Sequence, residues 1–163
     1  DRDVLEFRRV LFRSGSYNWP NGERYQGIYK NGKPHGRGVY HWPDGALYKG
    51  DWENGLFHGR GVYHFADGSC YEGEMVRGKS HGEGCYTWPD GRKYDGSWEK
   101  GCKCGHGTLT YPDGRIYTGE WKNDLFHGEG TMKYPDGSVQ SGLWRRGKTE
   151  EKTAPRGGGD GEP

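Results

Sequence analysis

The sequence predicts an all-β protein: an elongated, single-layer, twisted antiparallel sheet built from tandem 23-residue β-hairpin repeats. Three observations predict this fold. A tyrosine recurs every 23 residues, glycine accounts for 32 of 163 residues, and aromatic residues reach 15% although hydrophobic residues total only 29%. The scarcity of aliphatic side chains excludes a large aliphatic core. The formal charge of +1 and the abundant aromatics are atypical of a disordered chain.

The 23-residue period defines the domain organisation. Each unit starts with tyrosine, continues with glycine and a large side chain at alternate positions, and then contains Gly-x-Gly and Asp-Gly. Five full repeats cover 25–139, and a half repeat at each end extends the array to 15–147. The first tyrosines of the full repeats are Tyr25, Tyr48, Tyr71, Tyr94 and Tyr117.

The two ends lack the repeat. Residues 1–14 form a non-repeat segment that is either a cap for the first strand or non-native sequence; as a cap, it would place Val4, Phe7 and Leu11 on one face of a short helix. Residues 148–163 are rich in Gly, Glu, Lys and Pro, which predicts a disordered tail.

Within a repeat, the order of elements is strand, bend, strand, turn. Residues 48–52 alternate large and small side chains, which indicates a strand. A glycine-rich bend is expected at 54–59 and a second strand at 61–65. Pro-Asp-Gly then favours a tight turn into the next unit. Repetition of this order predicts an antiparallel meander of about twelve strands.

The alternation also predicts two different faces. Tyr48, Gly50 and Trp52 point to one face, and Tyr63 joins them if the hairpin register allows. The other face receives mostly polar side chains. One side of the sheet is therefore expected to carry a ladder of aromatic rings over glycines.

This pattern resembles the MORN (membrane occupation and recognition nexus) repeat family, whose consensus is Tyr-x-Gly-x-Trp, then Gly-x-Gly, then Asp-Gly. The resemblance covers about residues 15–147. It implies a twisted single-layer sheet with a grooved aromatic side, acting as a non-catalytic scaffold or targeting array for cytoskeletal, ciliary or membrane-junction assemblies. Some members dimerise end to end, and others carry the array beside a kinase or methyltransferase domain.

The predicted partner-binding site is the aromatic groove, because exposed Tyr and Trp side chains are enriched where proteins bind each other. The candidate residues are Tyr25, Tyr29, Tyr40, Trp42, Tyr48, Trp52, Tyr63, Phe65, Tyr71, Tyr86, Trp88, Tyr94, Trp98, Tyr111, Tyr117, Trp121, Tyr134 and Trp144. Met75, Leu109, Met132 and Gln140 depart from the pattern, so the ladder is expected to weaken toward the C-terminal half. The apolar bend tips, 56–57 and 125–126, either extend the site or fold back on their own sheet.

Catalytic residues, metal sites and cofactors are not expected. Equivalent atoms of neighbouring repeats lie about 9.5 Å apart, so the recurring histidines (His35, His58, His81 and His127) cannot share a zinc ion. Cys102, Cys104 and His106 lack a fourth ligand for a metal ion. The two cysteines are therefore expected to be a free, exposed thiol pair in a loop. The repeated Asp-Gly carboxylates are expected to be turn residues, because the carboxylates of an active site need different surroundings and these are equivalent copies.

The expected function is a non-catalytic scaffold whose groove docks an amphipathic helix of a partner protein and tethers a cytoskeletal or membrane-associated assembly. One alternative is a phospholipid-targeting module, although a cluster of 4–8 basic residues is missing from the sequence. The other is a regulatory region of a larger enzyme. A homodimer is a further option, and no nucleic-acid partner is expected. Without a disulfide framework or secretory signal, the expected location is cytoplasmic, with cytoskeletal, ciliary or peripheral-membrane association.

Overall fold

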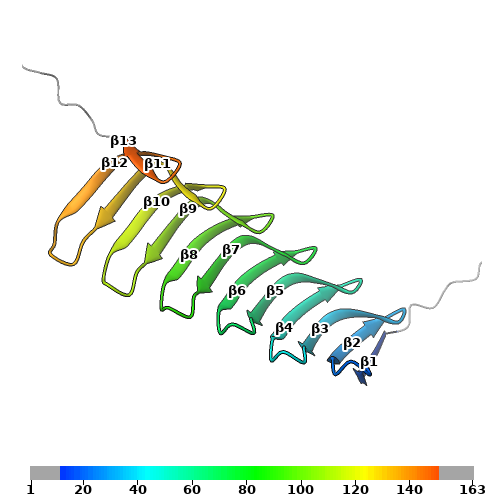
Figure 1. The fold of residues 1–163 in the computed structure, drawn as a ribbon. Coiled ribbons are helices and arrows are strands. Elements are labelled where there is room, and N and C mark those ends of the chain that lie inside the picture. The colour runs from blue at the N-terminus through cyan, green and yellow to red at the C-terminus, as the bar shows by residue number, and fades with distance from the viewer. Residues whose placement is uncertain (1–11, 151–163) are drawn as a thin grey trace, which may run out of the picture.

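The computed structural model of the protein describes residues 12–150. They form one sheet of thirteen strands, in which each strand is hydrogen-bonded to the next in chain order. Every pairing is antiparallel. Figure 1 shows the strands side by side in a single layer, with β1 at one end and β13 at the other. The predicted fold class, an elongated single-layer sheet of hairpin repeats, is confirmed.

Strands of seven and nine residues alternate from β2 to β12. The thirteen strands are β1 (Phe12–Asn18), β2 (Arg24–Lys30), β3 (Lys33–His41), β4 (Leu47–Glu53), β5 (Leu56–His64), β6 (Cys70–Val76), β7 (Lys79–Thr87), β8 (Lys93–Glu99), β9 (Cys102–Thr110), β10 (Ile116–Lys122), β11 (Leu125–Lys133), β12 (Val139–Arg145) and β13 (Lys148–Glu150).

The two ends of the sheet differ from the sequence expectation. β13 occupies the first three residues of the predicted disordered tail, because the turn at Arg146 and Gly147 returns the chain to β12 and pairs Thr149 with Trp144. β1 likewise includes Phe12 to Ser14 of the non-repeat N-terminal segment. The expected cap helix with Val4, Phe7 and Leu11, and the tail after residue 150, lie outside the described residues.

The predicted six-residue bend within each repeat is wrong. Only Asn54 and Gly55 form the turn, with φ of 52° and 85°, and residues 56–59 already belong to β5. Positive φ at both central residues is the signature of a type I′ hairpin turn, whose twist matches that of the flanking strands. The strands therefore continue almost to the tip of each hairpin.

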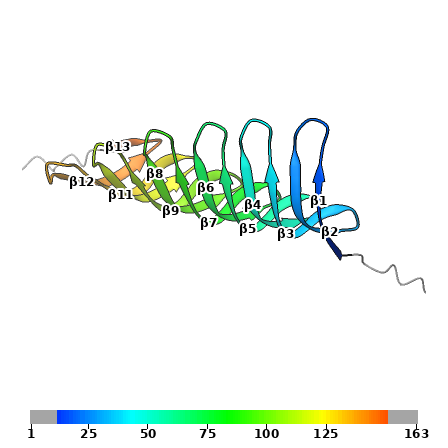
Figure 2. The ribbon, with the colours of Figure 1, turned by 90° about the horizontal axis from the view of Figure 1, so that it is seen from below.

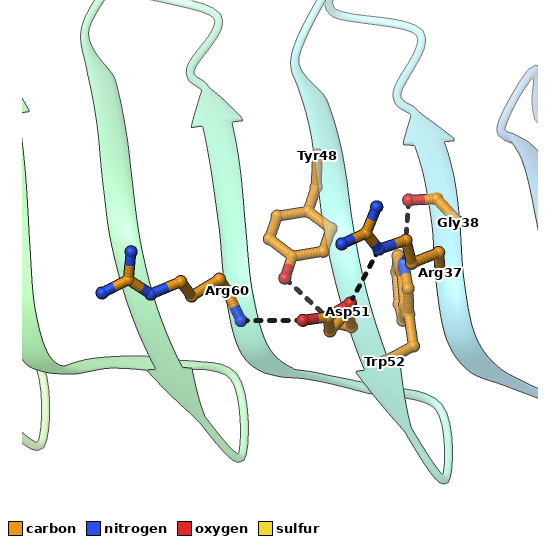
Figure 3. A network of polar contacts seen from close by, with 6 residues as sticks. All are labelled: Arg37, Gly38, Tyr48, Asp51, Trp52 and Arg60. Atoms are coloured by element: carbon orange, nitrogen blue, oxygen red, sulfur yellow. Dashed lines mark hydrogen bonds and ion pairs between the residues drawn. The ribbon is translucent and has the colours of Figure 1, made fainter.

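A β-bulge lies just before this turn. The pairing of β4 with β5 shifts between Gly50 and Trp52, so Asp51 has no partner residue on β5. Its carboxylate Oδ2 instead accepts a hydrogen bond from the backbone amide of Arg60 at 3.0 Å (Figure 3). Equivalent shifts recur in the other short hairpins, between β2 and β3, β6 and β7, β8 and β9, and β10 and β11. Bulges bend the strand that carries them, and Figure 2 shows that the strands curve along their length.

The core lies on one face, under the bend. The first tyrosine of every full repeat is at most 2% exposed. The hydroxyl of Tyr48 donates to the carbonyl of Asp51 at 2.9 Å, which holds the ring against the bulge of its own strand (Figure 3). The indole of Trp52 donates to the carbonyl of Gly38 at 3.2 Å, and the same bond recurs in three later repeats. Each of these four bonds joins a tryptophan to the preceding strand.

Candidate partner-binding face

All eighteen candidate residues lie in one continuous cluster on the bent side of the sheet. Half of them are almost completely buried: Tyr25, Tyr48, Trp52, Tyr71, Tyr94, Trp98, Tyr117, Trp121 and Trp144. Their rings form the floor of the face and are withdrawn from direct contact with a partner. The other half remain partly exposed: Tyr29, Tyr40, Trp42, Tyr63, Phe65, Tyr86, Trp88, Tyr111 and Tyr134.

A continuous row of rings in contact forms the surface of this face over β1 to β7. Neighbouring ring centroids in the row are 4.2–5.7 Å apart. We call this set the aromatic row; its members are Tyr17, Trp19, Tyr40, Trp42, Tyr63, Phe65, Tyr86 and Trp88. Tilted and edge-on arrangements at these distances are favourable for aromatic pairs. The row therefore offers a continuous apolar surface made of rings tilted against one another.

Four aromatic residues of the face were missing from the candidate set. Tyr17 and Trp19 extend the aromatic row to the first strand, and Trp19-Pro20 stands in register with Trp42-Pro43, so the repeat itself contained the signal. The other two are Phe57 and Phe126. Each folds back onto the sheet and stacks on the tyrosine of its repeat, with centroids 3.9 Å from Tyr48 and 3.8 Å from Tyr117.

The bend tips thus divide into two environments. The phenylalanine of each tip packs inward, whereas Leu56 and Leu125 remain 50% and 46% exposed. Of the two alternatives, folding back describes Phe57 and Phe126, and an outward apolar tip describes the leucines.

The aromatic row ends at Trp88, which confirms that the ladder weakens toward the C-terminus. Leu109 stands where Tyr63 and Tyr86 stand in earlier repeats, so no ring continues the stack. Lys103 stands where Phe57 and Phe126 stand, and its ammonium lies 5.4–5.7 Å from the ring centroids of Trp88, Tyr94, Trp98 and Trp121. Cation–π attraction accounts for this placement.

A cavity of about 210 Å³, which we call the Lys103 pocket, opens beside this ammonium. Trp88, Leu109, Tyr111, Trp121 and Phe126 form its apolar walls. The charged groups that line it are Arg92, Lys103 and Asp124. The Lys103 ammonium lies 3.1 Å from Asp124 Oδ1. Burial by itself would raise the pKa of Asp124, but the backbone amide and ammonium of Lys103 hold that pKa below its usual value.

Burial governs the ionisation of the tyrosines on this face. Desolvation of the phenolate raises the pKa of Tyr25, Tyr71 and Tyr117 to about 12. The pKa of the partly exposed Tyr40 is also raised to about 12, mainly by burial and further by the nearby carboxylate of Glu23. These phenols are neutral hydrogen-bond donors at physiological pH.

The opposite face is polar and carries mixed charge. A shallow groove of about 690 Å³ crosses β2 to β6, with Val39 and Val62 among its lining residues. Arg37 Nε lies 3.7 Å from Asp51 Oδ1 (Figure 3), and Arg60 Nη2 lies 3.6 Å from Glu74 Oε1. Because opposite charges alternate here, the groove presents no uniform field to a charged ligand.

The cysteines differ from the sequence expectation. Cys102 and Cys104 belong to strand β9 and are half-buried, so they are not an exposed pair in a loop. All four cysteines are free thiols, and burial is the main cause that raises the pKa of three of them, Cys70, Cys85 and Cys104. Across residues 12–150, His, Cys, Asp and Glu side chains form no group of three or more that could hold a metal ion. The same stretch contains no helix capable of crossing a bilayer.

Comparison with known proteins identifies the repeat. A family model described as MORN repeat matches residues 25–47, 48–70, 71–91, 94–114 and 117–139. No curated protein matches the chain.

Among solved structures, the chain resembles the SAS-4 (dCPAP) TCP domain of Drosophila melanogaster, solved in complex with a proline-rich motif of Ana2. The two are 15% identical with a TM-score of 0.52, over 80% of this chain and 72% of that one. The TCP10 domain of Danio rerio CPAP, in complex with a STIL peptide, is 17% identical over 83% of this chain and 64% of that one, with a TM-score of 0.38. At these identities the likeness concerns the fold alone.

Proposed function

The chain belongs to the MORN-repeat family, and on that premise we propose that it is a non-catalytic scaffold whose aromatic face docks a segment of a partner protein. One observation carries the proposal: eight rings form an unbroken, partly exposed row across seven strands. Soluble proteins rarely expose a contiguous apolar surface of this extent unless it is an interaction site. Tyr and Trp are also the residues that dominate binding energy at interfaces.

The buried half of the face supports the exposed half, which we propose to be rigid. Tyrosines such as Tyr48 and Tyr71 are bonded through their hydroxyls to backbone carbonyls beneath the row. Rigid rings lose little conformational entropy when a partner binds, so more of the contact energy appears as affinity. The buried residues therefore position the site, and the half-buried ones are the contact residues we propose.

Two conformations of the docked segment are consistent with a continuous aromatic surface. An amphipathic helix can lay its apolar side on the rings, and an extended proline-rich segment can place prolines between them. The Drosophila TCP domain, which shares the fold, was solved with a proline-rich motif. That comparison favours the extended segment as the second candidate beside the helix.

The decisive experiment compares two double variants of the full chain. Tyr63→Ala with Trp88→Ala removes two rings of the aromatic row, and His64→Ala with Thr87→Ala removes the adjacent exposed side chains of the opposite face. Partners captured from lysate are identified by mass spectrometry, and the binding segment is then measured by calorimetry. We expect loss of binding only in the ring variant, with the β-sheet circular dichroism of both variants retained.

Equal binding by both variants would refute the proposal. Circular dichroism of the bound segment distinguishes a helix from a polyproline conformation. Binding to anionic vesicles that disappears at high salt would instead support the phospholipid alternative. A concentration-dependent mass would support self-association through the edge strands β1 and β13. Fractionation of cells would test the proposed cytoskeletal, ciliary or membrane-associated location.

A further inference from the structure

The fourth full repeat carries a charged residue at a position that holds Pro34, Phe57, Ser80 and Phe126 in the other four. In the second and fifth full repeats, a phenylalanine follows the tight turn and covers the repeat tyrosine, as Phe57 covers Tyr48 and Phe126 covers Tyr117. In the fourth repeat, Lys103 occupies this position and pairs with Trp98 as Phe57 pairs with Trp52. A flexible cation thus replaces a flat ring in the aromatic cluster.

The surroundings of Lys103 are unusual for a lysine. Its side chain is only 14% exposed and is enclosed by four aromatic rings, with Asp124 as the ion-pair partner. An ammonium has three donors, and Asp124 Oδ1 occupies one of them, so donor capacity remains for a second acceptor. Low exposure strengthens any charge-assisted hydrogen bond made there.

A second substitution lies at the same pocket. Leu109 replaces the tyrosine found at 63 and 86, and it lines the Lys103 pocket of about 210 Å³ together with Trp88 and Phe126. Arg92 lies at the same pocket, with its guanidinium carbon 5.0 Å from the Trp88 ring. Arg92 Nε donates to Asp90 at 2.7 Å, which leaves its two terminal nitrogens for other acceptors.

Each cation at the pocket already has one carboxylate partner, Asp90 for Arg92 and Asp124 for Lys103, and each keeps donors that these contacts do not use. The apolar walls and these remaining donors together match a short acidic side chain, whose carboxylate can accept from both cations while its methylene groups contact the rings. The pocket also adjoins Trp88, the last ring of the aromatic row.

We propose that the Lys103 pocket binds the side-chain carboxylate of an Asp or Glu in the docked segment, and so sets the direction in which that segment lies on the face. The proposal rests on the proposed function. Apolar residues or prolines of the segment contact the aromatic row, and the acidic residue lies at the end nearest Lys103. Partners that lack an acidic residue at this position bind more weakly.

A peptide-display library of random sequence, selected on the full chain, tests both the pocket assignment and the proposed function. Parallel selections use Lys103→Phe, which restores the side chain of the second and fifth repeats and is therefore compatible with the fold, and Lys103→Met, which removes only the charge. Lys133→Met, an exposed lysine on the polar face, is the matched charge control. We expect an Asp or Glu at one fixed position in peptides selected by the wild type and by Lys133→Met, and its absence with both Lys103 variants.

The affinity measurement then isolates the contact. Replacing the selected Glu by Gln is expected to weaken binding to the wild type about 10-fold, and to leave binding to Lys103→Met nearly unchanged. Peptides that bind through the aromatic row without an acidic preference would overturn the pocket assignment alone. Failure to select any peptide, or binding that survives Tyr63→Ala with Trp88→Ala, would overturn the proposed function as well.

Discussion

At the residue scale, the packing of tyrosine against glycine determines whether the sheet can bend. The Tyr48 ring lies so close to Gly61 that a Cβ at Gly61 would approach Tyr48 Cζ to 2.6 Å. The opposite glycine, Gly50, is also excluded from carrying a side chain, because its Cβ would lie 2.5 Å from the Gly61 Cα. Glycine is therefore required here for close approach, although neither residue has an unusual φ.

Gly61→Ala is accordingly expected to destabilise the protein by about 1–3 kcal/mol, the usual cost of overpacking a core. The measurement is the free energy of unfolding in urea. Gly15→Ala is the matched control, because it occupies the corresponding position on β1 and its Cβ would meet only Tyr29 Cε2 at 3.9 Å. Equal losses in the two variants would contradict the packing explanation.

The buried phenols predict a loss of stability in alkali. The pKa of Tyr25, Tyr71 and Tyr117 is about 12 in the folded protein and about 10 in the unfolded chain. Because the folded pKa is the higher one, this contribution to stability is complete below pH 10 and is lost as pH rises toward 12. Circular dichroism and tyrosinate absorbance, recorded together against pH, should show unfolding and ionisation in the same window. Ionisation of all tyrosines near pH 10 without unfolding would refute this.

At the element scale, the two kinds of turn explain how short hairpins stack without a second layer. The Asp-Gly turn is held by its aspartate, as when Asp44 Oδ1 accepts the amide of Ala46 at 3.0 Å. The tight turn is tied to the preceding repeat, since the amide of Gly55 donates to the carbonyl of Pro34 at 2.8 Å. Each hairpin is therefore bonded to its neighbour at the tip as well as along its strands.

The tight turns also predict a stabilising substitution. Arg77 has a φ of 49°, in the left-handed region that asparagine tolerates better than arginine, and Asn54 holds the equivalent place in the preceding repeat. Arg77→Asn should raise the free energy of unfolding by about 0.5–1 kcal/mol, because asparagine is favoured in type I′ turns. Asn54→Arg is the reciprocal control and should lower it. Changes of the same sign in both variants would count against the explanation.

At the scale of the whole molecule, the shape follows from repetition. Thirteen strands spaced about 4.8 Å apart place the two edges about 58 Å from each other. Each strand contacts mainly its immediate neighbours, as in other repeat proteins, so stability accumulates along the array.

Small-angle X-ray scattering tests this shape directly. A compact domain of 163 residues has a radius of gyration of about 15 Å, whereas the extended sheet should give about 18 Å or more. The pair-distance distribution should be skewed toward long distances. A value near 15 Å at low protein concentration would contradict the extended array.

The repeat unit, the meander and the aromatic side of the sheet are all predictable from the amino-acid sequence. The 23-residue period places Tyr48 and Gly50 two residues apart in every copy, and a strand alternates its faces with the same period of two. The Asp-Gly turn was equally predictable, since the aspartate side chain bonds to the backbone two residues on and the glycine accepts a positive φ. Trp19 was also within reach, because its register with Trp42 is visible in the sequence.

Which aromatic rings are exposed, and where one repeat differs enough to form a separate site, depends on contacts made in the folded sheet. Tyr48 and Tyr63 look equivalent in sequence, yet the bulge after Gly50 bends the strand over Tyr48 and buries it, while Tyr63 stays on the surface. In the sequence, Lys103 is simply a polar residue in a Gly-rich segment, and no local pattern distinguishes it. Its four surrounding rings come from three parts of the sheet: Tyr94 and Trp98 belong to β8, Trp121 to β10, and Trp88 to the turn that follows β7. Contacts across strands depend on register that no local pattern encodes.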